Sequence, residues 1–344
     1  MKLTSERAVG YLPKLSRADF EELFWREHSR FADALCFQRE GADAALDRLA
    51  REHNEFETDA DGGRGQSYRT AQRATSARLV GIEALLRMVA GVIDLRGLPP
   101  GLRVLDVLGG DGLVTRALRL LAPDLPGTPI LTSDVAGHMV AEALRQGLPA
   151  VRQAADYLFM RTGTFDGVLI AYGSHHIDVA DRKSVCAEAF RVLRPGGRIV
   201  LHDFGVGSPV ARWFDEVVHR HTAAGHDYRH FTRDELRELL AKAGFTDIAV
   251  TEVYDPIRLA GTSESDAVEL LLRYLTAMYG LRPGRDGALL DWLEGNMCYD
   301  YDHIPDRADD WCPRLTVHSV DGGAVAELPR LALVASGVRP GCAR

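Results

Sequence analysis

From Arg103 onward, short apolar runs alternate along the chain with segments whose apolar residues recur at helical spacing. The apolar runs lie at 104–108, 130–133, 167–171, 198–202, 247–253 and 330–336, and the helical patterns between them at 113–121, 135–145, 182–193 and 232–243. This alternation predicts an α/β fold whose doubly wound, mainly parallel sheet carries helices on both faces. Sheets of this kind bind their ligands beyond the carboxyl ends of the strands.

The chain before this alternating region has a different pattern. Residues 17–57 and 67–94 carry apolar positions at helical spacing, and the Gly- and Pro-rich stretch 97–101 follows them. We therefore expect a helical N-terminal lid over residues 1–97 and a core domain over residues 98–254.

A second region outside the alternation precedes the final apolar run. Residues 265–279 and 286–295 have helical patterns, and the whole insertion is longer than an ordinary connection between two strands. We expect an inserted C-terminal cap over residues 255–320, followed by the final strand and tail over residues 321–344.

Composition narrows the class of protein and of ligand. The 344 residues are 46% hydrophobic and 26% charged, with 33 Gly and 15 Pro, which excludes collagen-like, coiled-coil and wholly disordered chains. A net charge of −8 without Lys/Arg runs favours a small-molecule ligand over nucleic acid. The five cysteines are scattered, and we find neither a signal peptide nor an apolar run long enough to cross a bilayer. We expect a reduced, cytoplasmic protein with no membrane partner.

A glycine-rich turn directly follows the first apolar run. Residues 104–112 read Val-Leu-Asp-Val-Leu-Gly-Gly-Asp-Gly, and such a turn lets backbone N–H groups approach a ligand closely. A dinucleotide fingerprint that starts at Gly110 fits Gly112 but needs a third glycine where Thr115 stands. The turn instead resembles the first motif of class I S-adenosylmethionine-dependent methyltransferases, in which an acidic residue near the strand end, here Asp106, precedes the glycines.

Further landmarks of that superfamily follow in order over residues 103–203. Asp134 ends the second run, where a carboxylate can accept two hydrogen bonds from a ribose diol. Asp156 resembles the acidic residue that receives the adenine amino group, and residues 190–199 resemble the helix–turn–strand before the family's fifth strand. The resemblance implies a seven-stranded Rossmann-like sheet with S-adenosylmethionine as cofactor. The cofactor-binding residues it implies are Tyr68, Arg73, Asp106, Gly110, Gly112, Asp134, Val135, Met139, Asp156, Tyr157, Ala171 and Tyr172.

Two positions near the methionine portion of the cofactor leave alternatives open. Leu108 replaces the first glycine of the family motif, and it is either accommodated by a shifted neighbour or reshapes the amino-acid end of the site. Arg73 or Arg69 either holds the methionine carboxylate with a two-pronged guanidinium contact or belongs to a solvated helix start.

Candidate catalytic residues follow the fourth run, at the mouth of the expected site. His175 or His176 suits the deprotonation of a hydroxyl, amine or acidic carbon, because imidazole titrates near neutral pH; the alternative is a role in packing or substrate shape. Tyr172 either turns an aromatic face to the positively charged sulfonium or packs at the strand end. His202 and Asp203 end the fifth run and could also reach the substrate.

A histidine-rich stretch lies beyond the fifth run. Its imidazoles and one carboxylate have spacings that could furnish ligands of a transition metal. We favour the alternative of a polar connecting segment and expect no metal. The residues are His219, His221, His226, His230 and Asp227.

Aromatic residues gather in the predicted cap. Three interpretations are open: they line a lid over the substrate, form a small core of the insertion, or make an oligomer contact such as that of a homodimer. The residues are Tyr299, Tyr301, His303 and Trp311.

Together these patterns predict an S-adenosylmethionine-dependent methyltransferase that acts on a small molecule. Its chemistry needs alignment of nucleophile, methyl carbon and sulfur, and exclusion of water. One alternative keeps the cofactor but attacks the γ-carbon of the methionine chain, as aminocarboxypropyl transferases and azetidine-2-carboxylate-forming cyclases do, and releases methylthioadenosine. A second alternative is a non-catalytic protein that binds S-adenosylmethionine.

Overall fold

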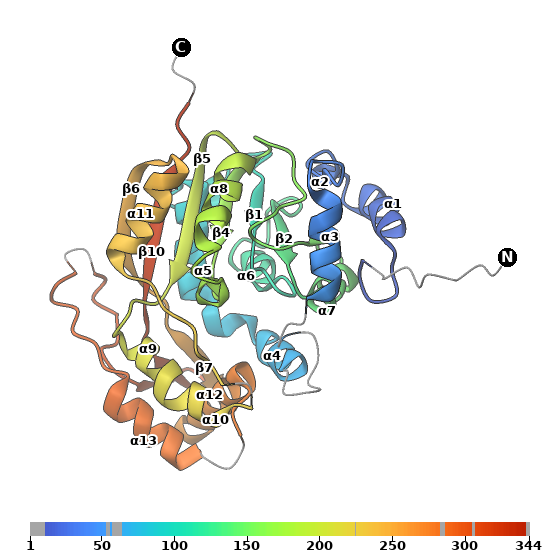
Figure 1. Cartoon of the computed structure of the whole chain (residues 1–344). Helices are drawn as coiled ribbons and strands as arrows, with labels where there is room; N and C mark the ends of the chain where they lie inside the picture. Colours follow the sequence, from blue (N-terminus) through green and yellow to red (C-terminus); the bar gives the residue numbers. More distant parts are fainter. Residues whose placement is uncertain are drawn as a thin grey trace.

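The computed structural model of the chain describes residues 11–52, 56, 64–223, 225–282, 286–304 and 307–341. The strands of its main sheet are β1 (Val104–Asp106), β2 (Ile130–Asp134), β3 (Ala150–Arg152), β4 (Phe165–Ile170), β5 (Leu193–Asp203), β6 (Thr246–Tyr254) and β10 (Leu331–Val338). They form a seven-stranded sheet in the order β3-β2-β1-β4-β5-β10-β6, in which only β10 runs antiparallel to its neighbours (Figure 1). The prediction of a doubly wound, mainly parallel Rossmann-like sheet is confirmed.

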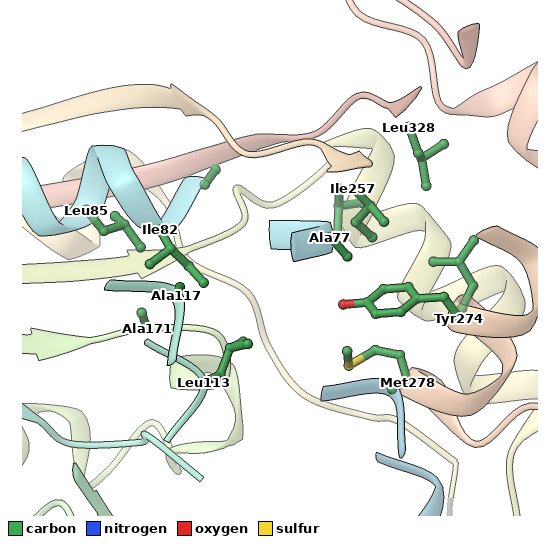
Figure 2. Packing of buried hydrophobic residues seen from close by; sticks show 14 of the residues in the cluster. Ala77, Ile82, Leu85, Leu113, Ala117, Ala171, Ile257, Tyr274, Met278 and Leu328 are labelled. Atoms are coloured by element: carbon green, nitrogen blue, oxygen red, sulfur yellow. The ribbon is translucent and has the colours of Figure 1, made fainter. Parts of the chain in front are cut away.

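Helices cover both faces of this sheet. They include α5 (Leu79–Ala90), α6 (Leu113–Leu121), α7 (Gly137–Arg145), α8 (Arg182–Val192) and α11 (Arg233–Ala243). Successive side chains of a strand point to opposite faces, so Val104 packs with α5 and α6 while its neighbour Leu105 packs with α7, α8 and α11. Figure 2 shows the face covered by α5 and α6, where Ile82 and Leu85 of α5 lie near Ala117 of α6. In the described part of the chain, we find no helix that is long and apolar enough to cross a membrane.

The helical region before the sheet has two parts, of which the first packs beside the edge of the sheet near β2 and the second leads to the helix that covers the sheet. Its helices are α1 (Arg17–Glu27), α2 (Ser29–Ala32), α3 (Ala42–Arg51), α4 (Gly65–Gln72) and the 3₁₀ turn η2 (Thr75–Arg78), followed by α5. α1 and α2 pack through Phe20, Phe24 and Phe31, and α3 through Leu49, into the layer that contains α7 and α8, beside β2 in Figure 1. The stretch expected as one helix over 67–94 is broken into α4, η2 and α5. The range 1–97, expected as a lid, includes α5, although this helix packs on the main sheet and is part of the core.

The insertion before β10 carries a second sheet that the sequence pattern did not predict. Its elements are β7 (Ile257–Gly261), α12 (Glu264–Tyr279), α13 (Asp286–Asn296), β8 (Thr316–Val320) and β9 (Gly323–Leu328). The two helices lie within a residue of the ranges expected for them. The strands form an antiparallel sheet in the order β7-β9-β8. The inserted cap thus continues to Leu328, beyond the expected boundary at residue 320.

The aromatic residues of the cap pack with one another. The rings of Tyr254 and Trp311 stack with centroids 4.9 Å apart, and Tyr301 is buried against both. Tyr299 stacks on Tyr301 at 5.9 Å. This cluster also contains Leu331 of β10 and packs against Val80 of α5, so these aromatic residues join the insertion to the main sheet. His303 lies apart from this cluster, exposed, with its Nε2 2.9 Å from a carboxylate oxygen of Glu252.

The chain crosses between the two sheets twice, and a buried ion pair joins the crossings. Asp255 follows β6 and Arg330 precedes β10, and both are at most 2% exposed. Arg330 Nη2 donates to Asp255 Oδ2 at 2.5 Å and its Nε to the Asp255 carbonyl at 2.9 Å, while the Asp255 N–H donates to the Arg330 carbonyl at 3.0 Å. A second guanidinium, that of Arg78, lies 3.7 Å from the same carboxylate oxygen. A side chain at Gly81 would place its Cβ 1.9 Å from Asp255, so glycine is required there.

We predict that Arg330→Met lowers the free energy of unfolding by about 3–5 kcal/mol, because it leaves the Asp255 carboxylate buried with too little compensating charge. Urea denaturation followed by circular dichroism measures this. The matched control is Arg96→Met, which removes an exposed ion pair with Asp94 and is expected to leave the midpoint unchanged. A loss below about 1 kcal/mol for Arg330→Met would contradict the role assigned to the crossing.

Candidate active site

A cavity of about 300 Å³ opens at the carboxyl ends of β1, β2 and β4, where a doubly wound sheet binds its ligands. The strands themselves are buried, so the residues that follow each strand provide the side chains that reach the opening. Eight of the candidate residues from the sequence line this cavity. They are Tyr68, Gly110, Asp134, Val135, Met139, Asp156, Tyr172 and His176.

The remaining candidates lie outside the described lining of the cavity. Arg73 is exposed at the end of α4, and the Tyr157 hydroxyl donates to the carbonyl of Glu40 at 2.7 Å. Gly112 caps the start of α6 with a φ of 90°, a backbone conformation that favours glycine. The candidates outside the lining are Arg73, Asp106, Gly112, Tyr157, Ala171 and His175.

The glycine turn after β1 holds the carboxylate of Asp134 in place. Gly110, at a φ of 55°, donates its backbone N–H to Asp134 Oδ2 at 2.9 Å, and Ala136 donates to Oδ1 at 2.9 Å. A carboxylate oxygen can accept more than one hydrogen bond. Asp134 can therefore bind a diol while both backbone amides keep it oriented.

Asp106 lies beneath this turn. Its side chain is 1% exposed, and its Oδ2 has no hydrogen-bond partner among the described residues. Burial, with a smaller contribution from the Asp134 carboxylate, raises the pKa of Asp106 to about 8. The carboxyl group is therefore largely protonated at neutral pH, and it supports the turn from below as a neutral group.

On the opposite wall, α3 and the segment after it bring residues that the motifs did not indicate. Arg48, on α3, forms a two-pronged ion pair with Asp156, with both N–O distances at 2.7 Å. Glu52, the extended residue that ends α3, and Phe56, beyond the helix, also line the cavity. The sequence pattern of this stretch does not say that it lies against the sheet's carboxyl edge.

Tyr172 follows β4 in a strained conformation. Its φ of 60° is uncommon for a residue other than glycine, and such strain concentrates at functional sites. The Arg78 guanidinium lies 4.2 Å from the centre of its ring, and its hydroxyl donates to Asp255 at 3.3 Å. Burial and the Asp255 carboxylate raise its pKa well above the usual value for tyrosine, so the phenol stays protonated. Arg78, not Arg73, is the buried arginine next to this wall.

The adjacent histidines have different environments. His176 lines the cavity, whereas His175 is 5% exposed and places its Nδ1 2.9 Å from Asp203 Oδ2. Burial, together with the neighbouring His175, lowers the pKa of His176 well below the usual value for histidine. His176 is therefore neutral at neutral pH.

The end of β5 and the histidine-rich stretch differ from expectation. His202 and Asp203 are 0% and 1% exposed, so neither reaches a substrate in the cavity; they hold neighbouring side chains instead. His226 and His230 are buried against His175, with ring centroids 5.1 and 5.0 Å away. The stretch is therefore not merely a polar connection, because half of its histidines pack into the site.

Leu108, which replaces a motif glycine, lines the cavity. Its Cδ1 would lie 3.9 Å from a Cβ atom at Gly173, so the two residues are neighbours. Its side chain therefore takes up space at the end of the cavity that is formed by the residues after β1 and β4.

Comparison with known proteins matches residues 69–250 to a family described as a methyltransferase domain, which is more than half of the chain. The malonyl-[acyl-carrier protein] O-methyltransferase of Geobacter sulfurreducens is 32% identical over 50% of this chain and 64% of its own. A demethylmenaquinone methyltransferase of Thermus thermophilus is 35% identical over 37% of this chain and 58% of its own. The chain thus spans less than two thirds of the length of these relatives.

Among solved structures, a phosphoethanolamine N-methyltransferase 2 of Haemonchus contortus in complex with S-adenosyl-L-methionine aligns with a TM-score of 0.44 at 17% identity. The alignment covers 76% of this chain and 52% of that one.

We predict that the unfolding free energy of the cofactor-free protein decreases as the pH rises from about 4 to about 8, because of the ionisation of Asp106. Asp106→Asn should remove this part of the pH dependence. The folded carboxyl keeps its proton up to a pKa of about 8, whereas the unfolded one releases it near 3.8, so unfolding releases a proton in this window. Urea titrations at several pH values measure the slope. The exposed Asp94→Asn serves as control and should leave the slope above pH 5 unchanged; an unaltered slope in Asp106→Asn would contradict the raised pKa.

Proposed function

Since this chain belongs to the family of methyltransferase domains, with S-adenosylmethionine as cofactor, we propose that it transfers a methyl group from this cofactor to a small molecule. The observation that carries the proposal is the Asp134 carboxylate, which Gly110 and Ala136 orient at the edge of the cavity. A carboxylate held in this way is suited to accept hydrogen bonds from both ribose hydroxyls.

The other lining residues fit the remaining parts of the cofactor. Val135 and Met139 offer an apolar surface next to Asp134 for the adenine ring. Asp156, fixed by Arg48, is placed to accept from the adenine amino group. Leu108 and Tyr172, after β1 and β4, face the amino-acid portion.

When bound, the cofactor supplies an electrophilic methyl carbon on a positively charged sulfur. The protein has to align the acceptor with this carbon and exclude water. Phe56 packs on Tyr68 at 4.9 Å and on His176 at 5.6 Å, so three aromatic rings line this part of the cavity together. His176 lines the cavity, and in this proposal it is the side chain next to an acceptor that needs deprotonation.

The cap sets the size of the acceptor in this proposal. The Arg64 guanidinium, next to α4, donates to the carbonyl of Met278 in α12 at 2.8 Å, which ties the wall that carries Tyr68 to the cap. The relatives named above act, by their names, on an oxygen of malonyl-[acyl-carrier protein] and on demethylmenaquinone. We infer an acceptor similar in chemistry to these two, without nucleic acid as substrate.

We predict that the protein forms S-adenosylhomocysteine from S-adenosylmethionine only when a suitable acceptor is present. The assay is mass spectrometry of reactions with a panel of phenols, hydroquinones, carboxylic acids and their thioesters, with heat-treated protein as control. Methylthioadenosine as the product would overturn methyl transfer in favour of attack at the γ-carbon. Tight cofactor binding without product across the panel would favour a non-catalytic role.

We further predict that Asp134→Ala weakens the binding of S-adenosylhomocysteine by about 10-fold or more, because hydrogen bonds to a charged group contribute about 1.5–3 kcal/mol. Isothermal titration calorimetry measures the affinity, and circular dichroism verifies that the variant is folded. Asp124→Asn, at an exposed position outside the cavity lining, is the control and should bind as the wild type does. Equal affinities for the Asp134 variant and the wild type would refute the assignment of the ribose subsite.

A further inference from the structure

The carboxylate of Asp203 is the centre of a buried histidine cluster. It lies 2.9 Å from His175 Nδ1 and 3.2 Å from His230 Nδ1. It also accepts from the Ser174 hydroxyl at 2.6 Å and from the backbone N–H of Phe204 at 2.7 Å. A carboxylate with so many donors is ionised, and a neutral imidazole bound to it carries its hydrogen on Nδ1. The lone pair of each imidazole is then on Nε2.

The Nε2 atoms of this cluster take no part in the hydrogen bonding of the described residues. Nε2 of His175, His226 and His230 is buried without a hydrogen-bond partner among the residues that the structure describes, although each side chain is at most 5% exposed. Buried nitrogen atoms normally find a partner, because an unpaired one has lost its hydrogen bonds to water without replacing them. Several such atoms in one cluster indicate a ligand that accepts lone pairs.

The geometry of three rings matches such a ligand. The ring centroids of His175, His176 and His226 are 4.5, 5.1 and 5.3 Å apart, and one nitrogen of each lies within 4.8 Å of the others. Three imidazoles around a tetrahedral ion with metal–nitrogen bonds of about 2.0–2.1 Å have centroids about 5 Å apart. We propose that these three histidines bind a divalent transition-metal ion, with zinc as the best match to neutral imidazole ligands.

The surroundings of the cluster are those of a metal site. The contact of Asp203 with His175 is the carboxylate–histidine arrangement that orients a metal ligand from behind. Phe214 stacks on His226 at 4.3 Å with 20° between the ring planes, and it begins a π-helix (Phe214–Val218), a conformation frequent at functional sites. His219 Nδ1 accepts the backbone N–H of His226 at 3.0 Å.

The site adjoins the cavity through His176, which is a member of both. Three protein ligands leave one position of a tetrahedral ion open, as in catalytic zinc sites. An oxygen of the acceptor could take that position, and His176 would then hold the acceptor through the ion instead of taking up its proton. This role rests on the proposed function, whereas the binding of the metal does not.

A competing location exists in the cap, where Cys312, His318 and Glu327 also have ligand atoms close together. There the Glu327 carboxylate is already paired with the Arg258 guanidinium, at 2.7 Å, and it also accepts from the hydroxyl of Tyr254. A metal at that position would have to displace a cation. We therefore expect the histidine cluster to bind more tightly.

The test is a metal titration of the full chain without cofactor. The protein is treated with a chelator, dialysed and titrated with Zn²⁺ or Co²⁺; elemental analysis gives the stoichiometry and the visible spectrum of Co²⁺ reports nitrogen ligation. His226→Phe removes one ligand but keeps the stacking on Phe214, so the fold should survive, which circular dichroism verifies. His303→Ala, at an exposed histidine, and Cys312→Ser, in the competing location, are the controls.

We expect one ion per chain in the wild type and in both controls, and an affinity at least 100-fold lower in His226→Phe. Asp203→Asn should weaken binding by about 10- to 100-fold through the orientation of His175. Failure of the wild type to bind one equivalent overturns the proposal, and so does unchanged binding in His226→Phe or its loss in Cys312→Ser. Since cofactor and acceptor are absent, none of these outcomes depends on methyl transfer.

Discussion

A single buried carboxylate, that of Asp255, determines how the parts of this protein fit together. A charge of this kind is stable in the interior only with cations beside it, and Arg330 and Arg78 provide them from two distant segments. Arg330 precedes the last strand and Arg78 precedes the helix that covers the sheet. The same carboxylate accepts from the Tyr172 hydroxyl, and the Arg78 guanidinium lies over the Tyr172 ring. The wall of the cavity is therefore positioned by the ion pair that connects the two sheets.

Local patterns in the sequence predicted much of the fold. The range expected for α6, which follows Gly112, agrees with the structure to the residue. That for α12 agrees to within one, because the helix ends at the left-handed Gly280. The cap sheet was missed because β8 is mostly exposed and has no alternation of apolar and polar residues. β3 was missed because its three residues end in Arg152 and contribute only two apolar positions, whereas the equally short β1 continues into Val107 and Leu108. The break between α4 and α5 was missed as well, since it depends on what each segment packs against.

The candidate site was predictable where it is built from the loops that follow strands. Glycine and aspartate have to stand at fixed positions there, and the topology of the sheet brings these loops together. Arg48 and His226 come from segments that reach the site only through tertiary packing, so nothing in their own neighbourhood indicates the contact. The burial of Asp203 and His202 was equally hidden, because a polar strand end is usually a surface position.

The crossings at Asp255 and Arg330 have an evolutionary consequence. The polypeptide leaves the main sheet and returns to it at two points joined by a backbone hydrogen bond, so everything between them is attached like a cassette with adjacent ends. Insertions of this geometry are tolerated by a host domain, because the spacing of its own strands does not change. Homologous proteins could lengthen, exchange or remodel the segment between Asp255 and Arg330 without changing the main sheet. Diversity among such proteins would then accumulate between these two residues.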